Sequence, residues 1–168
     1  FGLLSIGATA QITLTADDIP DFGEVYANAV DTLLTSVDVG PASADAQTWS
    51  FLNFDADEVF TNTVVMPSET PAADLFPTAT FAFEGSNELY SFAEVTSDAL
   101  FAAGGSAPGP DGTIFTVAFE NQQQLLPLPA TYGAVFEDEF SYRLEIDGGT
   151  FGADSVRLIG GGTVEAEV

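Results

Sequence analysis

Acidic side chains gathered in two short turns have the clearest capacity for chemistry in this chain. Calcium takes about six to eight oxygen ligands, mainly from carboxylates and carbonyls. The residues of this type are Asp17, Asp18 and Asp21 in the first turn and Asp55, Asp57 and Glu58 in the second. Neither turn has the spacing of an EF-hand loop. The sequence therefore predicts two candidate Ca²⁺ sites. The alternative is a pair of solvated acidic turns, since acids are common in turns for local hydrogen bonding.

The chain lacks the residues that most other catalytic mechanisms need. The chain contains no histidine and no cysteine, and its two basic residues are Arg143 and Arg157, so it has no lysine either. Ser-His-Asp and Cys-His catalysis, His/Cys metal sites, a lysine Schiff base and a P-loop lysine are all excluded. We expect no organic cofactor, and Ca²⁺ is the one cofactor that the composition favours.

Paired carboxylates are the remaining route to catalysis. The densest acidic run near aromatic residues is Glu137, Asp138 and Glu139. A glycosidase needs two carboxyl groups at a set distance and polar groups that hold the sugar. With 26 acids, pairs arise by chance, so we expect no enzyme. Trp49 and Tyr90 could instead stack sugars in a calcium-dependent glycan-binding module.

The pattern of the whole chain predicts an all-β fold. Short runs rich in β-branched and aromatic residues alternate with Gly, Pro, Asp and Asn at roughly 8–12-residue spacing. The predicted strands include residues 11–15, 24–30, 47–54, 59–66, 78–83, 88–95, 113–120, 139–146 and 156–159. We expect residues 11–168 to form a single antiparallel β-sandwich or jelly-roll-like domain. It would have about ten short strands and at most one or two short helical turns.

Other segments are predicted as connections. Residues 103–112 (AGGSAPGPDG) are the clearest loop, residues 122–129 fit an edge or connecting segment, and residues 72–76 fit a helical turn with Thr70 as its N-cap. Alternating aromatic pairs are predicted to fill the core between two packed sheets. These pairs are Trp49 with Phe51, Phe81 with Phe83, and Phe115 with Phe119.

The N-terminus has three alternative interpretations. Residues 1–10 (FGLLSIGATA) match the end of a secretory signal peptide, or else form a first strand. A sharper alternative is donation of residues 2–15 as a strand to a neighbouring subunit of an extracellular filament. The apolar residues that would be donated are Leu3, Leu4, Ile6, Ile12 and Leu14.

The net charge of −24 indicates which partners the chain can bind and which habitat suits it. Such a charge repels nucleic-acid phosphates and anionic lipid surfaces, so we expect neither partner, and no membrane insertion of the mature domain. Self-repulsion is relieved by salt, because the Debye length falls from about 10 Å at 0.1 M to about 3 Å at 1 M. We therefore expect a marine or halophilic source and an extracellular or cell-surface location.

Several segments resemble the N-terminal region of secreted Bacteroidetes surface proteins of the kind exported by type IX secretion. They are QITLTADDIPDFGEVY, QTWSF, LLPLPATYGAVFEDEF and DSVRL. The resemblance implies export and attachment to the cell surface or release from it, within a longer protein whose sorting domain lies outside this chain. The expected function is a non-catalytic structural or adhesion module. Its partners would be other surface proteins, copies of itself, or glycans, and its terminal strand would be cut short.

Overall fold

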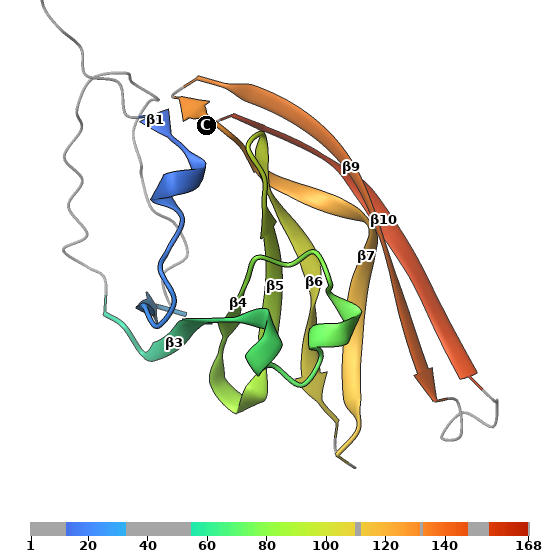
Figure 1. Cartoon of the computed structure of the whole chain (residues 1–168). Coiled ribbons are helices and arrows are strands. Elements are labelled where there is room, and N and C mark those ends of the chain that lie inside the picture. Colours follow the sequence, from blue (N-terminus) through green and yellow to red (C-terminus); the bar gives the residue numbers. More distant parts are fainter. Residues whose placement is uncertain (1–12, 33–54, 110–111, 132, 148–154, 168) are drawn as a thin grey trace, which may run out of the picture.

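The fold is all-β, antiparallel and sandwich-like, as predicted. In the computed structural model, residues 13–32, 55–109, 112–131, 133–147 and 155–167 are described, and they form ten strands (Figure 1). Four three-residue 3-10 turns, rather than one or two, connect them: η1 (Ala16–Asp18), η2 (Pro67–Glu69), η3 (Ala73–Leu75) and η4 (Ser86–Glu88). No helix in these ranges is long and apolar enough to cross a bilayer.

Eight strands form one large sheet whose order follows the chain. In sequence they are β2 (Val25–Val30), β3 (Glu58–Val65), β4 (Phe81–Glu84), β5 (Tyr90–Val95), β6 (Ala99–Pro108), β7 (Ile114–Pro127), β9 (Val135–Asp147) and β10 (Ser155–Glu167). Each pairs antiparallel with the next, so the sheet is a meander rather than the Greek-key order of a jelly roll. The remaining strands, β1 (Thr13–Leu14) and β8 (Ala130–Thr131), pair with each other.

The segment predicted as the clearest loop is a strand over residues 103–108, which belong to β6, so that prediction is wrong. Residues 122–127 are the second half of β7 and pair with β6 but not with β9, whose pairing with β7 ends at Asn121, so the prediction of an edge segment is confirmed for them. The misleading residue is Gly104, which reads as a loop residue. Its φ of +147° places it at a bulge between β6 and β7, where a Cβ would lie 2.1 Å from the Val117 carbonyl oxygen. Glycine is therefore required there by close strand packing, not by a turn.

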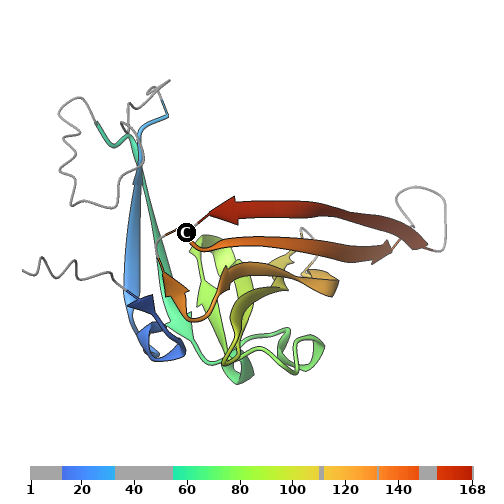
Figure 2. The same ribbon diagram turned by 90° about the horizontal axis from the view of Figure 1, so that it is seen from above.

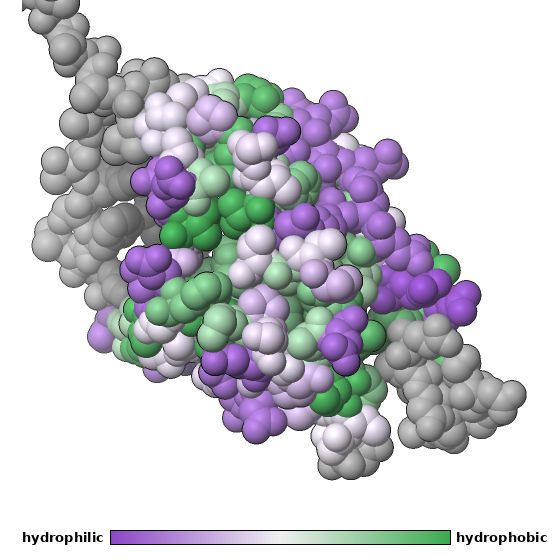
Figure 3. Space-filling model, in the orientation of Figure 1, coloured by the Kyte–Doolittle hydropathy of each residue, from purple (hydrophilic) through white to green (hydrophobic). Residues whose placement is uncertain are grey.

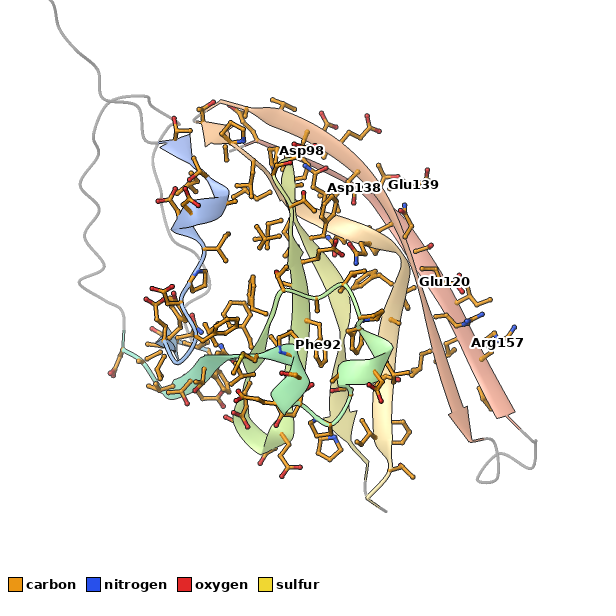
Figure 4. All side chains as sticks on the ribbon, viewed as in Figure 1. Phe92, Asp98, Glu120, Asp138, Glu139 and Arg157 are labelled. Atoms are coloured by element: carbon orange, nitrogen blue, oxygen red, sulfur yellow. The ribbon has the colours of Figure 1, made fainter. Side chains whose placement is uncertain are left out.

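The central strands are covered on both faces. On one face, which we call the Phe92 face, Ala82, Phe92 and Ala103 are buried beneath Phe76, which follows η3. The Phe76 and Phe92 rings are stacked with centroids 4.0 Å apart. Figure 1 shows this green segment crossing in front of the sheet, and Figure 4 labels Phe92. The predicted helical turn is confirmed as η3, although Ala72 rather than Thr70 is its N-cap.

The opposite face, which we call the Phe81 face, buries Val64, Phe81 and Ala93. Ile19 and Phe83 pack against this cluster, so the prediction of a Phe81/Phe83 core pair is confirmed. The prediction for Phe115 is wrong, because this side chain is 38% exposed near one end of β7. Trp49 and Phe51 lie outside the described residues. The core is thus centred on β3–β6, and it thins toward β9 and β10.

Candidate functional site

The first acidic turn is a capped 3-10 turn. Asp17 and Asp18 lie in η1, and the Asp18 carboxylate accepts hydrogen bonds from the Thr15 backbone N–H at 2.8 Å and from its hydroxyl at 2.9 Å. These bonds hold the pKa of Asp18 below its ordinary 3.8. Asp21 follows, and its carbonyl accepts a bond from the Glu24 N–H. The carboxylate of Asp18 is therefore already used to hold its own turn.

The second acidic turn closes the end of the β2–β3 pair. The Asp57 carboxylate accepts bonds from the Thr32 hydroxyl and from the Thr32 N–H, and the hydroxyl bond is the main cause that lowers the Asp57 pKa. At the same end of the β2–β3 pair, the Asp55 N–H donates to the Asp31 carboxylate at 3.2 Å. Glu58 begins β3, opposite Val30. These acids join two strands that are separated by more than twenty residues in sequence.

The two turns do not merge into one site. Within the described ranges, no three acidic side chains come together in a group that could hold a metal ion. The bonds of Asp18 and Asp57 to threonines are those expected of acids that stabilise turns. Calcium binding stays a prediction, and among these six acids the structure gives the carboxylates of Asp18 and Asp57 a structural role.

Both threonine–aspartate contacts should make stability pH-dependent on the acid side. A carboxyl whose pKa is lowered in the folded state stabilises the fold above its unfolded pKa, here 3.8. That contribution is lost as pH falls through the folded pKa. A Thr15→Val/Thr32→Val variant should melt roughly 2–5 °C below the wild type at pH 7. The difference should shrink as the pH falls below 3.8 and the two carboxyl groups become protonated in the folded state. Thermal melts of both proteins across this range measure it, and a difference independent of pH would contradict the assignment.

The residue proposed to stack sugars is in the core. Tyr90 is only 9% exposed, and its hydroxyl donates to the Glu84 carboxylate at 3.1 Å. Burial, followed by this hydrogen bond, raises the Tyr90 pKa. The prediction of Tyr90 as a carbohydrate platform is therefore wrong, because its ring faces the protein interior. Trp49, the other predicted sugar-stacking residue, lies outside the described residues. Neither of the two predicted residues is therefore seen as an exposed platform in the described part of the chain.

The acidic run on β9 is divided between the two faces of its strand. Successive strand side chains point to opposite faces, so Asp138 is separated from Glu137 and Glu139. Figure 4 labels Asp138 and Glu139 on this strand. The half-buried Asp138 carboxylate accepts a bond from the Gln124 backbone N–H at 2.7 Å. This bond satisfies a backbone N–H of β7 that is not paired with β9, because the two strands diverge beyond Asn121, the last residue of β7 that pairs with β9. The run is therefore not a compact carboxylate pair.

An open depression of about 500 Å³ lies beside η2 and η3. Its lining is mainly apolar and includes Phe22, Met66, Phe76 and Pro77, with Asp74 as its acidic residue. It could accept an apolar side chain. It does not include any of the predicted acids.

One of the predicted donor-strand residues is used within its own chain. Leu14 lies in β1 and pairs with Ala130 of β8, so its prediction as a donated residue is wrong. The reason is that β8, after the Leu128–Pro129 bond, leaves the main sheet and offers a short edge to β1. Leu3, Leu4, Ile6 and Ile12 lie outside the described residues.

The most distinctive surface is the β9–β10 hairpin, where the sequence predicts three short strands, residues 139–146, 156–159 and 163–168. The two strands pair over thirteen residues each with no shift of register. β9 pairs with β7 only from Ser141 to Leu144, so both ends of the hairpin extend past the sheet. Figures 1 and 2 show β10 at the outer side of the sheet. Among the described strands, none pairs with the outer edge of β10.

One face of the hairpin is mainly apolar, with Asp138 as an acidic residue on it. Phe140, Tyr142 and Leu144 alternate along β9 and lie opposite Gly162, Gly160 and Leu158 of β10. The glycines leave room for the rings: a Cβ on Gly160 would lie 2.5 Å from the Tyr142 ring. Phe119 of β7 packs edge-on against both Phe140 and Tyr142. The glycine run in β10 is therefore a strand segment covered by aromatic rings, a known device for stabilising glycine in sheets.

The other face of the hairpin is charged. Arg143 pairs with Glu120 of β7 at 3.2 Å, and further along Glu137 lies opposite Glu165. Like charges directly opposite each other destabilise an antiparallel pair. Figure 3 shows hydrophilic residues gathered on the side of the molecule formed by this hairpin. The alternation of acids with aromatics along residues 135–144 is the sequence signal that could have revealed the two faces.

Comparison of this chain with protein-family models, with curated proteins and with solved structures found no match.

Proposed function

We propose that this chain is a non-catalytic structural or adhesion module of a larger secreted or cell-surface protein. The observation that carries this proposal is the β9–β10 hairpin, a long and regular pair of strands whose outer edge is not paired with any other described strand. An exposed edge is a template for pairing with another chain. Large apolar side chains are also exposed elsewhere, for example Phe22, Phe60 and Val59. These features favour binding to proteins over catalysis.

The charge supports the extracellular part of the proposal. A net charge of −24 suits an environment in which salt screens the repulsion. In the described contacts, the carboxylates of Asp18 and Asp57 accept hydrogen bonds from threonines of the same chain. The acidic surface is then a means of staying soluble in salt rather than a binding site for one ligand.

Location and adhesion can be tested together. Protease added to intact cells of the organism that makes the protein should cleave the chain, while a cytoplasmic marker stays whole. Beads coated with the chain should be retained on those cells several-fold more than beads coated with an unrelated protein of equal negative charge. Protection from protease until lysis, or retention equal to that of the control beads, would refute the proposal.

Stability should increase with salt if the acidic surface is adapted to a salty exterior. We expect the melting temperature to rise by roughly 5 °C or more between very low salt and about 1 M NaCl, because screening reduces the repulsion among the acids. Sodium chloride is preferred to sulfate, since sulfate strengthens hydrophobic burial by itself. An unchanged melting temperature would contradict the marine or halophilic habitat.

A further inference from the structure

We propose that two copies of this chain associate through their β10 strands, which pair antiparallel about a two-fold axis at Gly161. The interface would join two eight-stranded sheets into one continuous sheet. This inference rests on the proposed function, because it names a second copy as the partner of the hairpin edge. It is argued from the length of β10, the placement of its charges, and the match of side chains on each face.

The edge of β10 has only part of the usual protection against pairing, namely the charged side chains of Arg157, Glu165 and Glu167. Natural edge strands are kept short or carry lysine, proline or bulges. β10 has thirteen residues, which extend about 44 Å, contains neither lysine nor proline, and pairs with β9 without a bulge. The opposite edge of the sheet, β2, offers only six residues. β10 is therefore the better template for a second strand.

The charges of β10 are complementary to themselves in one register. When Gly161 lies opposite Gly161 of a second copy, antiparallel pairing places Arg157 opposite Glu165 of that copy. The two-fold axis repeats this pair, so each dimer contains it twice. Arg157 and Glu165 are eight residues apart in a regular strand and lie on the same face of the sheet. Figure 4 shows Arg157 on the outer side of the hairpin.

The same register also matches the uncharged residues. Leu158, which is 53% exposed, comes opposite Val164 on the apolar face. Ile159, which is 69% exposed, comes opposite Thr163 on the charged face. Gly160 comes opposite Gly162, so the aromatic rings that cover these glycines in each copy lie side by side across the axis. No apolar residue between 157 and 165 is placed opposite a charge.

Pairing also offsets an unfavourable feature of the isolated hairpin. Within one chain, Glu165 lies opposite Glu137 on β9. Arg157 of the second copy would lie on the other side of Glu165, and a guanidinium has five N–H donors, enough for more than one carboxylate. The acids at this end of the hairpin would then have a basic neighbour.

The first measurement is the oligomeric state of the full chain. Sedimentation velocity and light scattering should be run from micromolar to millimolar protein in about 1 M NaCl, where a Debye length near 3 Å screens the repulsion between the copies. A concentration-dependent monomer–dimer equilibrium is expected. A monomer over the whole range would overturn the proposal.

Charge reversal then locates the interface. Glu165→Arg would create a favourable pair with Glu137 in its own chain but a repulsive pair with Arg157 of the second copy. It should therefore keep the melting temperature of the monomer while weakening the dimer roughly 10- to 100-fold. Arg157→Glu should also weaken the dimer, and the double variant should restore it to within about threefold of the wild type. Glu69→Arg, an equal charge change on η2, should have little effect.

Cysteine crosslinking tests the register, since the natural chain has no cysteine. Ile159→Cys mixed with Thr163→Cys should form a disulfide-linked dimer on mild oxidation, because directly opposite Cβ atoms are about 5 Å apart. Either variant alone should crosslink at least several-fold less. Equal crosslinking of the single variants, or a dimer that survives Glu165→Arg, would place the interface elsewhere and refute the proposal.

The two proposals fail separately. If the Glu165→Arg variant no longer dimerises but beads coated with it are still retained on cells, the chain is an adhesion module that also dimerises in its natural form. If retention fails while the dimer forms, the proposed function is refuted and the β10 interface stands.

Discussion

Replacing Gly104 with alanine is expected to lower the free energy of unfolding by roughly 3 kcal/mol or more. Two costs add at this position. The φ of +147° is one that residues with a side chain rarely adopt, and a Cβ would lie 2.1 Å from the Val117 carbonyl oxygen and 2.6 Å from the Phe76 ring. The Val117 atom belongs to the backbone of β7, so relief requires β6 and β7 to separate.

Gly112→Ala is the matched control for this experiment. Gly112 also has a positive φ, of +83°, but no heavy atom lies within 4 Å of the Cβ position. Its replacement should cost only the backbone strain, about 1 kcal/mol. Urea unfolding curves of the three proteins measure both values. Equal losses in the two variants would show that crowding between β6 and β7 does not contribute.

Replacing Phe92 with alanine is expected to destabilise the protein by roughly 3–5 kcal/mol. The Phe92 side chain is 1% exposed and is one of the largest fully buried side chains of the described residues. It is stacked on Phe76, and its loss would leave a cavity between β5 and the η3 segment. Because domains are stable by only about 5–15 kcal/mol, this variant should lose a large part of its stability.

Two comparisons make the Phe92 experiment specific. Phe22→Ala removes the same side chain from a position that is 57% exposed, and it should cost less than about 1 kcal/mol. A double-mutant cycle with Phe76→Ala should give a coupling of about 0.5–1.5 kcal/mol for the stacked rings. If Phe92→Ala cost no more than Phe22→Ala, the Phe92 face would not be the principal core.

Much of the secondary structure could be predicted because it depends on local patterns. The alternation in residues 59–66 and 113–120 predicted β3 and the first half of β7, and the Phe81/Phe83 alternation correctly predicted buried residues. By contrast, β6 was missed because its small residues carry no strand signal of their own. Gly104 and Ala103 are selected by Phe76 and Val117, which lie far away in sequence.

The candidate site was harder to predict than the fold. The acidic turns were correctly identified as turns, but their use depends on partners such as Thr32, twenty-five residues before Asp57. Tyr90 was assigned to a surface platform because its hydroxyl suits a rim position. The structure supplies Glu84 as an internal acceptor instead, which allows the ring to be buried.

By itself, the sequence determined the class of fold, the missing catalytic residue types and the charge. These properties follow from composition and from short-range alternation. Only the tertiary structure decided that β10 is the last of the described strands in the sheet, that Glu165 is opposite Glu137, and that the glycine run lies under aromatic rings. The physical reason is that strand order and register are set by pairing between distant segments and by bulges, and local pattern contains no information about either.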